Sequence, residues 1–180
     1  MRALRAEEYY TYEDWLALED DLRAELIDGA IYYMSSPAHA HQRISGEIFR
    51  QFANFLIDKS CEVIAAFNVR LDKKRDTVFI PDISVICDPQ KMTERACEGA
   101  PDLIVEILSP STSNYDRFTK FHEYRNAGVL EYWIVDPSDK TITAHRLKDG
   151  EYVTTIYTDT GTAKTLFGCE IDLTLVFPKD

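Results

Sequence analysis

The stretch Asp102–Leu108 reads DLIVEIL, and it decides the fold. A short, almost continuous apolar run is typical of a strand that is covered on both faces of its sheet. A helix is expected over about Ser113–Ala127, because Gly128 stands where helices end, and Glu131–Val135 reads EYWIV as a further strand. Strand, helix and strand at this length predict a parallel pair with a right-handed crossover.

Patterns on either side of this unit add helices and antiparallel strands. Residues 25–34 read ELIDGAIYYM and predict a hairpin, because Asp-Gly supplies the positive φ of a tight turn. Residues 39–58 predict a helix, since apolar residues recur there at three- and four-residue steps. Strands are also expected over 61–71 and 77–87, and over 141–147 and 151–157, where they form a C-terminal antiparallel meander. We therefore predict an α/β fold (α+β) with a mixed sheet and flanking helices.

Length and composition fit one folded domain over residues 1–180. Hydrophobic residues make up 45% of the chain, which argues against intrinsic disorder. Twenty basic residues against thirty-one acidic ones give a net charge of −11. This balance excludes an architectural protein that holds nucleic acid by bulk positive charge. A local basic groove, or a site where bound cations supply the positive charge, remains open.

The four cysteines are widely spaced, and no pair has the spacing of a zinc site. Two disulfides are possible, but the size of the chain and the absence of a signal-like N-terminus favour reduced, buried thiols. No apolar run approaches the roughly 20 residues of a membrane span. We expect a cytoplasmic protein without membrane contact.

Two acidic residues in apolar strands are the main functional signal. Glu106 lies inside LIVEIL, and Asp82 follows Pro81 and opens the run ISVIC. An unpaired buried charge is costly, so each carboxylate needs a compensating partner. The two could converge on a hard cation such as Mg²⁺, which binds a few carboxylates and keeps waters for a phosphate. Equally, Asp82 could cap the entrance of its strand while Glu106 pairs with an arginine, and the spacing does not separate these interpretations.

The order Pro81-Asp82, twenty-three intervening residues and Glu106 resembles the signature of the PD-(D/E)XK nuclease superfamily. Other strings are similar to those of the Uma-two family of putative restriction endonucleases, and the resemblance covers essentially the whole chain. These strings are residues 25–29 (ELIDG), 37–44 (PAHAHQRI), 81–85 (PDISV), 101–112 (PDLIVEILSPST) and 128–137 (GVLEYWIVDP).

The resemblance implies a restriction-endonuclease-like core and a divalent-metal-dependent endonuclease, with DNA as the expected nucleic acid. Asp82 and Glu106 would hold Mg²⁺ or Mn²⁺, and Glu25 could supply a third oxygen ligand. The cation would activate a water and offset charge on the phosphate during phosphodiester hydrolysis. The resemblance also implies a homodimer, since cutting both strands needs two sites.

The chain departs from the superfamily pattern at Leu108, where a lysine is usual. Lys120, on the following helix, is the obvious substitute for orienting water and stabilising negative charge. Helical spacing does not support it independently, because Lys120 projects roughly opposite Phe118, so either the helix contacts protein on two sides or Lys120 is solvated. His41 should face the sheet, where it could hydrogen-bond a site carboxylate, accept a proton or be structural. For Tyr124, packing is favoured over a place in the cleft.

Two rivals to the nuclease hypothesis stay open. Leu108 and the acidic balance fit a catalytically degenerate nuclease fold that acts as a nucleic-acid-binding or interaction module. The second rival is a metal-dependent hydrolase of small phosphate esters, because a net charge of −11 repels a small phosphate ester less than it repels a DNA duplex. The carboxylates in apolar strands argue against the degenerate-module hypothesis, because a protein without catalytic activity could replace these costly charges.

Overall fold

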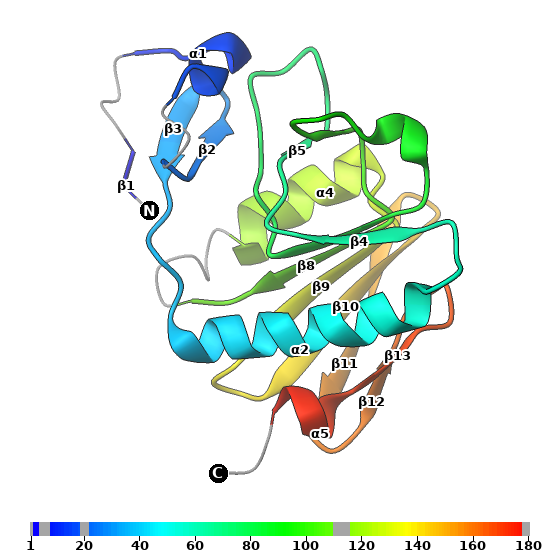
Figure 1. The fold of residues 1–180 in the computed structure, drawn as a ribbon. Helices are drawn as coiled ribbons and strands as arrows, with labels where there is room; N and C mark the ends of the chain where they lie inside the picture. The colour runs from blue at the N-terminus through cyan, green and yellow to red at the C-terminus, as the bar shows by residue number, and fades with distance from the viewer. Residues whose placement is uncertain (1, 4–7, 19–21, 110–115, 178–180) are drawn as a thin grey trace.

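A six-stranded mixed sheet forms the centre of the computed structural model, which describes residues 2–3, 8–18, 22–109 and 116–177 (Figure 1). Its strand order is β11-β10-β9-β8-β6-β4, and β8 and β9 run parallel while the other neighbouring pairs are antiparallel. The six strands are β4 (Glu62–Ala65), β6 (Ile83–Ile86), β8 (Leu103–Ile107), β9 (Glu131–Asp136), β10 (Thr141–Lys148) and β11 (Glu151–Thr158). The predicted α/β fold with a mixed sheet and a C-terminal meander is confirmed.

Short elements complete the described part of the chain. They are β1 (Arg2–Ala3), α1 (Tyr12–Leu16), β2 (Ala24–Ile27), β3 (Ala30–Tyr33), β5 (Val69–Arg70), β7 (Cys97–Glu98), β12 (Thr162–Lys164), β13 (Glu170–Asp172), α5 (Leu173–Val176) and a 3₁₀ turn at Pro89–Lys91. No helix among the described residues combines the length and apolar character that crossing a bilayer requires.

The long helix α2 (His39–Leu56) covers one face of the sheet (Figure 1). Its buried residues are Ile44, Ile48, Phe52 and Leu56. The first three belong to the predicted stripe, whose fourth member, Phe55, is only partly buried. These side chains form one apolar cluster with Leu103, Val105 and Ile107 of β8. Burial of each large apolar side chain contributes roughly 1.5–3 kcal/mol, so this layer is a principal source of stability.

The opposite face of the sheet is covered by a π-helical turn (Asp116–Lys120) that continues into α4 (Phe121–Ala127). The helix ends at Gly128, whose φ of 87° is left-handed as the sequence predicts. Tyr124 of α4 packs in the same cluster as Ile104. Because alternate residues of a strand face opposite sides, Glu106 shares the face of Ile104 and points toward α4.

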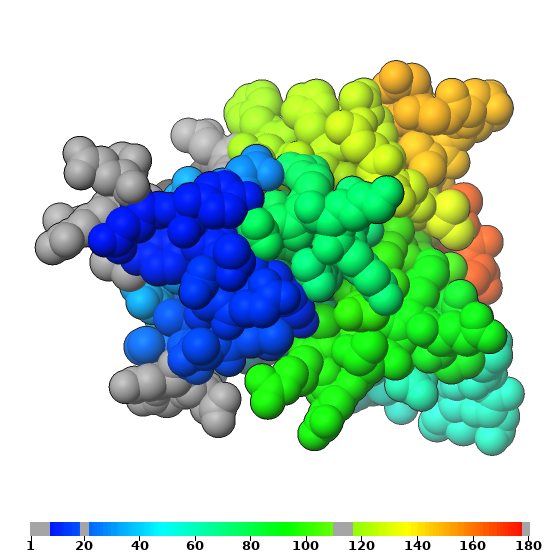
Figure 2. Space-filling model, turned by 90° about the horizontal axis from the view of Figure 1, so that it is seen from above, coloured from blue at the N-terminus to red at the C-terminus, as the bar shows by residue number. Residues whose placement is uncertain are grey.

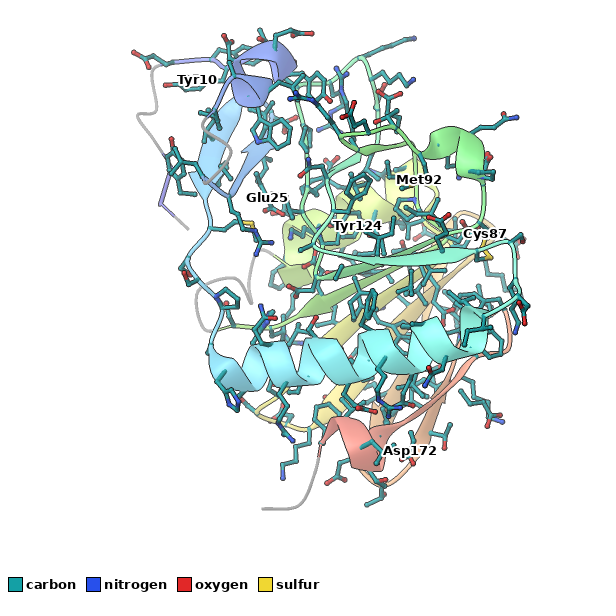
Figure 3. All side chains as sticks on the ribbon, viewed as in Figure 1. Tyr10, Glu25, Cys87, Met92, Tyr124 and Asp172 are labelled. Atoms are coloured by element: carbon teal, nitrogen blue, oxygen red, sulfur yellow. A yellow bond between two sulfur atoms is a disulfide. The ribbon has the colours of Figure 1, made fainter. Side chains whose placement is uncertain are left out.

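The hairpin β2–β3 docks on the edge of this layer. Asp28 and Gly29 have φ values of 47° and 78°, which are the values of the tight turn that the sequence predicts. Leu26 exchanges backbone hydrogen bonds with Val78 at 2.7 and 3.0 Å, and these bonds tie the hairpin to the segment that leads into β6. Glu25 is thereby held on the side of the hairpin that faces the sheet and α4 (Figure 3).

The predicted strands over 61–71 and 77–87 are each shorter than expected. The first is divided into β4 and β5 by a bend at Ala66, whose φ is 50°, and only the end of the second forms β6. The prediction of reduced cysteines is wrong for one pair, because Cys61 and Cys87 form a disulfide. The register pairs Glu62 with Ile86, so the next residues outward, the two cysteines, stand opposite each other.

Candidate active site

The five residues singled out from the sequence line one cavity of about 1010 Å³. The cavity lies between the docked hairpin, the N-terminal end of α2, and the ends of β6 and β8. Its lining includes Glu25, His41, Asp82, Glu106 and Lys120. Segments from five parts of the chain, including the π-helical turn that carries Lys120, therefore bring these side chains together.

Asp82 and Glu106 stand opposite each other on neighbouring strands. Ile83 pairs with Val105 in the antiparallel β6–β8 register, so the next pair outward is Asp82 with Glu106. Directly opposite residues have Cβ atoms roughly 4.5–5.5 Å apart. One Asp82 oxygen, Oδ2, accepts a 2.8 Å hydrogen bond from the backbone N–H of Ile107. The register therefore places the backbones of the two acids side by side at the ends of adjacent strands.

Lys120 joins two of the three acids. Its Nζ lies 2.8 Å from Oε1 of Glu106 and 2.9 Å from Oε1 of Glu25. The side chains of Glu25, Glu106 and Lys120 are only 0%, 6% and 3% exposed. Glu25 Oε1 also accepts a 2.9 Å hydrogen bond from the backbone N–H of Ile80. A charge-assisted network in so dry a site is electrostatically strong, and it ties the hairpin to the sheet through the helix.

The burial of Lys120 settles which side of its helix faces the protein. Helical spacing places Lys120 opposite Phe118, and the structure buries Lys120 and Tyr124 while Phe118 is 65% exposed. Residues four apart share one face of a helix, so Lys120 and Tyr124 approach Glu106 together. Among the described residues, a cation that pairs with Glu106 is therefore this lysine, where the alternative interpretation expected an arginine.

Tyr124 is a site residue that the sequence argument assigned to packing. Its hydroxyl donates a 2.9 Å hydrogen bond to Glu106 Oε1, and its ring is fully buried (Figure 3). Burial, and then the neighbouring carboxylates of Glu106 and Glu25, raise the pKa of Tyr124 well above its usual value. The hydroxyl consequently keeps its proton and remains a donor. The four-residue spacing from Lys120 was the one signal that could have identified it.

His41 holds Asp82 from the start of α2. Its Nε2 lies 3.2 Å from Asp82 Oδ2 and 3.1 Å from the backbone oxygen of Ile107. Both partners are acceptors, so Nε2 must carry the hydrogen that it donates. Of the three roles left open by the sequence, these contacts match hydrogen bonding to a site carboxylate.

The donor set fits a hard divalent cation. Three carboxylates against one ammonium leave the cluster formally negative, and carboxylate oxygens are the ligands that Mg²⁺ prefers. Oε2 of Glu25 is buried and has no hydrogen-bond partner among the described residues. Within the same ranges, no three His, Cys, Asp or Glu side chains are placed so that together they could hold a metal ion. Mg²⁺ commonly binds through one or two carboxylates plus waters and substrate phosphates, so an incomplete protein cage is compatible with it.

Two arginines that the sequence argument did not select line the same cavity. Arg117 forms a 2.6 Å ion pair with Asp136 across the rim. Arg23 precedes β2 and is exposed. These two arginines place positive charge at the rim of a cavity whose lining also holds four acids, Glu25, Asp82, Glu106 and Asp136.

The mixed sheet, with paired acids at the β6–β8 strand ends and a buried helix lysine, is the architecture of a nuclease-like protein. A crystal structure described as a putative nuclease belonging to DUF820, from Anabaena variabilis, superposes with a TM-score of 0.76 at 21% identity, covering 93% of this chain and 97% of that one. The model of the Uma2 family, described as "Putative restriction endonuclease", matches residues 6–175, and the chain belongs to this family.

Two curated relatives come from Synechocystis sp., and both are described as uncharacterised proteins. One is 32% identical over 146 residues, covering 78% of this chain and 76% of the relative. The other is 27% identical over 138 residues, covering 75% and 76%. The sequence similarity thus extends over about three quarters of each chain.

Proposed function

We propose that this protein is a divalent-metal-dependent endonuclease that hydrolyses phosphodiester bonds in DNA. The observation that carries the proposal is the bridge from Lys120 Nζ to Glu25 and Glu106, at 2.9 and 2.8 Å, beside the Asp82–Glu106 pair. Membership of a family described as restriction endonucleases supplies the reaction class. The lysine that the strand lacks at Leu108 is replaced from the helix.

Asp82, Glu106 and Glu25 would hold Mg²⁺ or Mn²⁺. When bound, such a cation offsets negative charge on the phosphate and makes a water easier to deprotonate. Asp82 is suited to this role because Oδ2 is fixed by Ile107 and His41, while Oδ1 has no hydrogen-bond partner among the described residues. The buried Oε2 of Glu25 is a further oxygen of this kind.

Lys120 and two positioning residues complete the proposed machinery. The ammonium of Lys120 orients the attacking water and stabilises the charge that develops on the phosphate, and a dry site makes that stabilisation large. His41 positions Asp82 through Nε2, and Tyr124 positions Glu106 through its hydroxyl. Neither contact requires the positioning group to exchange a proton during the reaction.

The decisive experiment is incubation of purified protein with supercoiled plasmid in Mg²⁺, Mn²⁺ or EDTA. Nicking is expected with metal and not with EDTA, and it should be lost in the isosteric variants Asp82→Asn and Glu106→Gln. Glu62→Gln is the matched control, because Glu62 is an exposed acid on β4 of the same sheet. Equal nicking by the Asp82 and Glu106 variants would refute the proposal.

A substrate panel separates the remaining candidates. Hydrolysis of a small phosphate ester without nicking would favour the small-substrate hydrolase, and binding of DNA without turnover would favour the degenerate module. The proposal includes a homodimer, as the family resemblance implies. Sedimentation velocity should therefore give twice the mass of 20.7 kDa, and the monomer mass would contradict this part.

A further inference from the structure

A second cavity adjoins the acid-lined one. Its volume is about 490 Å³, and it lies between α1 with the start of β2 on one side and the segments around residues 66–68 and 94–95 on the other. Figure 2 shows residues 8–18, in blue, lying directly against the green part of the chain that includes these segments. Arg23 and Ala66 line both cavities, so the two lie next to each other.

Two half-buried aromatic rings line this second cavity, and each is fixed beside an acid of the first. Trp15 donates a 2.7 Å hydrogen bond from Nε1 to the backbone oxygen of Ala24, which immediately precedes Glu25. Phe67 follows Ala66, whose N–H donates a 3.0 Å hydrogen bond to the backbone oxygen of Asp82. Each ring is therefore anchored through the backbone to a segment that also carries an acid of the first cavity.

The second cavity also carries unpaired positive charge. Arg23 and Arg95 line it, both are exposed, and neither guanidinium has an acidic partner among the described residues. The backbone of Arg95 is anchored, because its oxygen accepts a 2.7 Å hydrogen bond from Asn68 Nδ2. Aromatic faces combined with free guanidinium groups are the means by which proteins bind unpaired bases and the adjoining phosphates.

We infer that this cavity is a subsite for an unpaired nucleobase next to the cleaved phosphate, so the substrate is a single strand or a single-stranded segment. The inference rests on the proposed nuclease function for the nature of its ligand. A base must leave its duplex before its face can stack on Trp15 or Phe67. Base stacking does not depend on net positive charge. It would therefore allow a chain with a net charge of −11 to bind a polyanion.

The test is a fluorescence titration in EDTA with a short oligothymidylate, compared with the same strand paired to oligoadenylate. The chain has two tryptophans, and Trp133 is fully buried, so quenching reports Trp15. The single strand should quench the fluorescence and bind more tightly than the duplex. Trp15→Ala should weaken binding of the single strand by roughly 5- to 150-fold, as measured by anisotropy of a labelled strand.

Further variants test the inference even if the Trp15→Ala variant does not fold. Phe67→Leu should also weaken binding, whereas Trp15→Phe keeps a ring and should bind nearly normally without the fluorescence change. Arg95→Ala should reduce the slope of log affinity against log salt by about 0.7. Arg43→Ala is the matched control, since Arg43 is an exposed arginine on α2 outside both cavities, and its slope should stay that of the unmodified protein.

Equal affinity for single strand and duplex, or unchanged affinity in both Trp15→Ala and Phe67→Leu, would overturn the inference. Its failure is distinguishable from failure of the nuclease proposal. Metal-dependent nicking without any tryptophan response would leave the nuclease standing and refute the subsite. A tryptophan response that Trp15→Ala removes, without cleavage in metal, would support the subsite and refute the enzyme.

Discussion

Replacement of Lys120 by methionine is the sharpest perturbation of the acid cluster. Methionine keeps most of the volume of the side chain but removes the ammonium that contacts Glu25 and Glu106 at 2.9 and 2.8 Å. Both carboxylates are buried, so the variant leaves two uncompensated charges in a dry site. Breaking a buried ion pair in this way costs about 3–5 kcal/mol of unfolding free energy.

The expected shift in melting temperature follows from the size of the chain. Unfolding entropy is about 2.1 cal/mol/K per residue, which for 180 residues is about 0.38 kcal/mol/K. A loss of 3–5 kcal/mol therefore lowers Tm by about 8–13 °C in EDTA, as measured by differential scanning calorimetry. Lys148→Met is the matched control, because Lys148 is exposed, and it should melt within about 2 °C of the unmodified protein.

Two additional measurements distinguish lost charge compensation from lost packing. The double variant Glu25→Gln with Lys120→Met removes one of the two uncompensated charges. Its Tm should therefore be higher than that of the single variant Lys120→Met. Saturating Mg²⁺ should raise the Tm of Lys120→Met more than that of the unmodified protein, because a bound cation replaces the missing positive charge. If Lys120→Met had the same Tm as the Lys148→Met control, the assignment of a buried ammonium between the acids would be refuted.

Three other predictions concern separate features. Burial lowers the pKa of His145 to about 4, below its usual 6.5, so the unfolded state binds more protons between these values. The free energy of unfolding in urea should therefore fall by about 3 kcal/mol as the pH drops from 7 to 4, and His145→Gln should lack that part of the decrease. Replacing Cys61 and Cys87 by serine opens a loop spanning 26 residues and should cost about 3.5 kcal/mol, and thiol titration of the unreduced, denatured protein should count only Cys97 and Cys169. Tyr124→Phe loses a hydrogen bond to a charged group, so it should be about 1.5–3 kcal/mol less stable and need more metal for half-maximal nicking.

The central fold could be predicted because its signals are local. The apolar run at β8, the stripe of α2 and the Asp28–Gly29 turn each depend on residues within a few positions of one another. The hairpin and the parallel β8–β9 pair follow from them with little tertiary information. The bend at Ala66 could not be predicted in this way, because alanine carries no preference for its φ of 50°.

The acids of the site were also visible in the sequence, whereas the groups that hold them were not. A carboxylate in an apolar strand indicates that some group must compensate its charge, but the sequence does not identify that group. The partner of Glu106 depends on which face of the following helix packs against the sheet. Helical spacing correctly places Lys120 opposite Phe118, but spacing alone does not say which of these two sides packs against the sheet. The disulfide was missed for a related reason, since the pairing of Cys61 with Cys87 depends on the β4–β6 register.

The position of the proposed site lysine on the helix, rather than on the strand, also has a structural consequence. Leu108, at the usual lysine position, is buried in the apolar cluster that includes Ile104 and Tyr124. A side chain from the helix instead spans the gap between Glu106 on the sheet and Glu25 on the hairpin. One ammonium therefore both completes the cluster and holds the hairpin in place. Because Ala24 of the same hairpin also anchors Trp15, docking of the hairpin assembles the acid site and the aromatic cavity together.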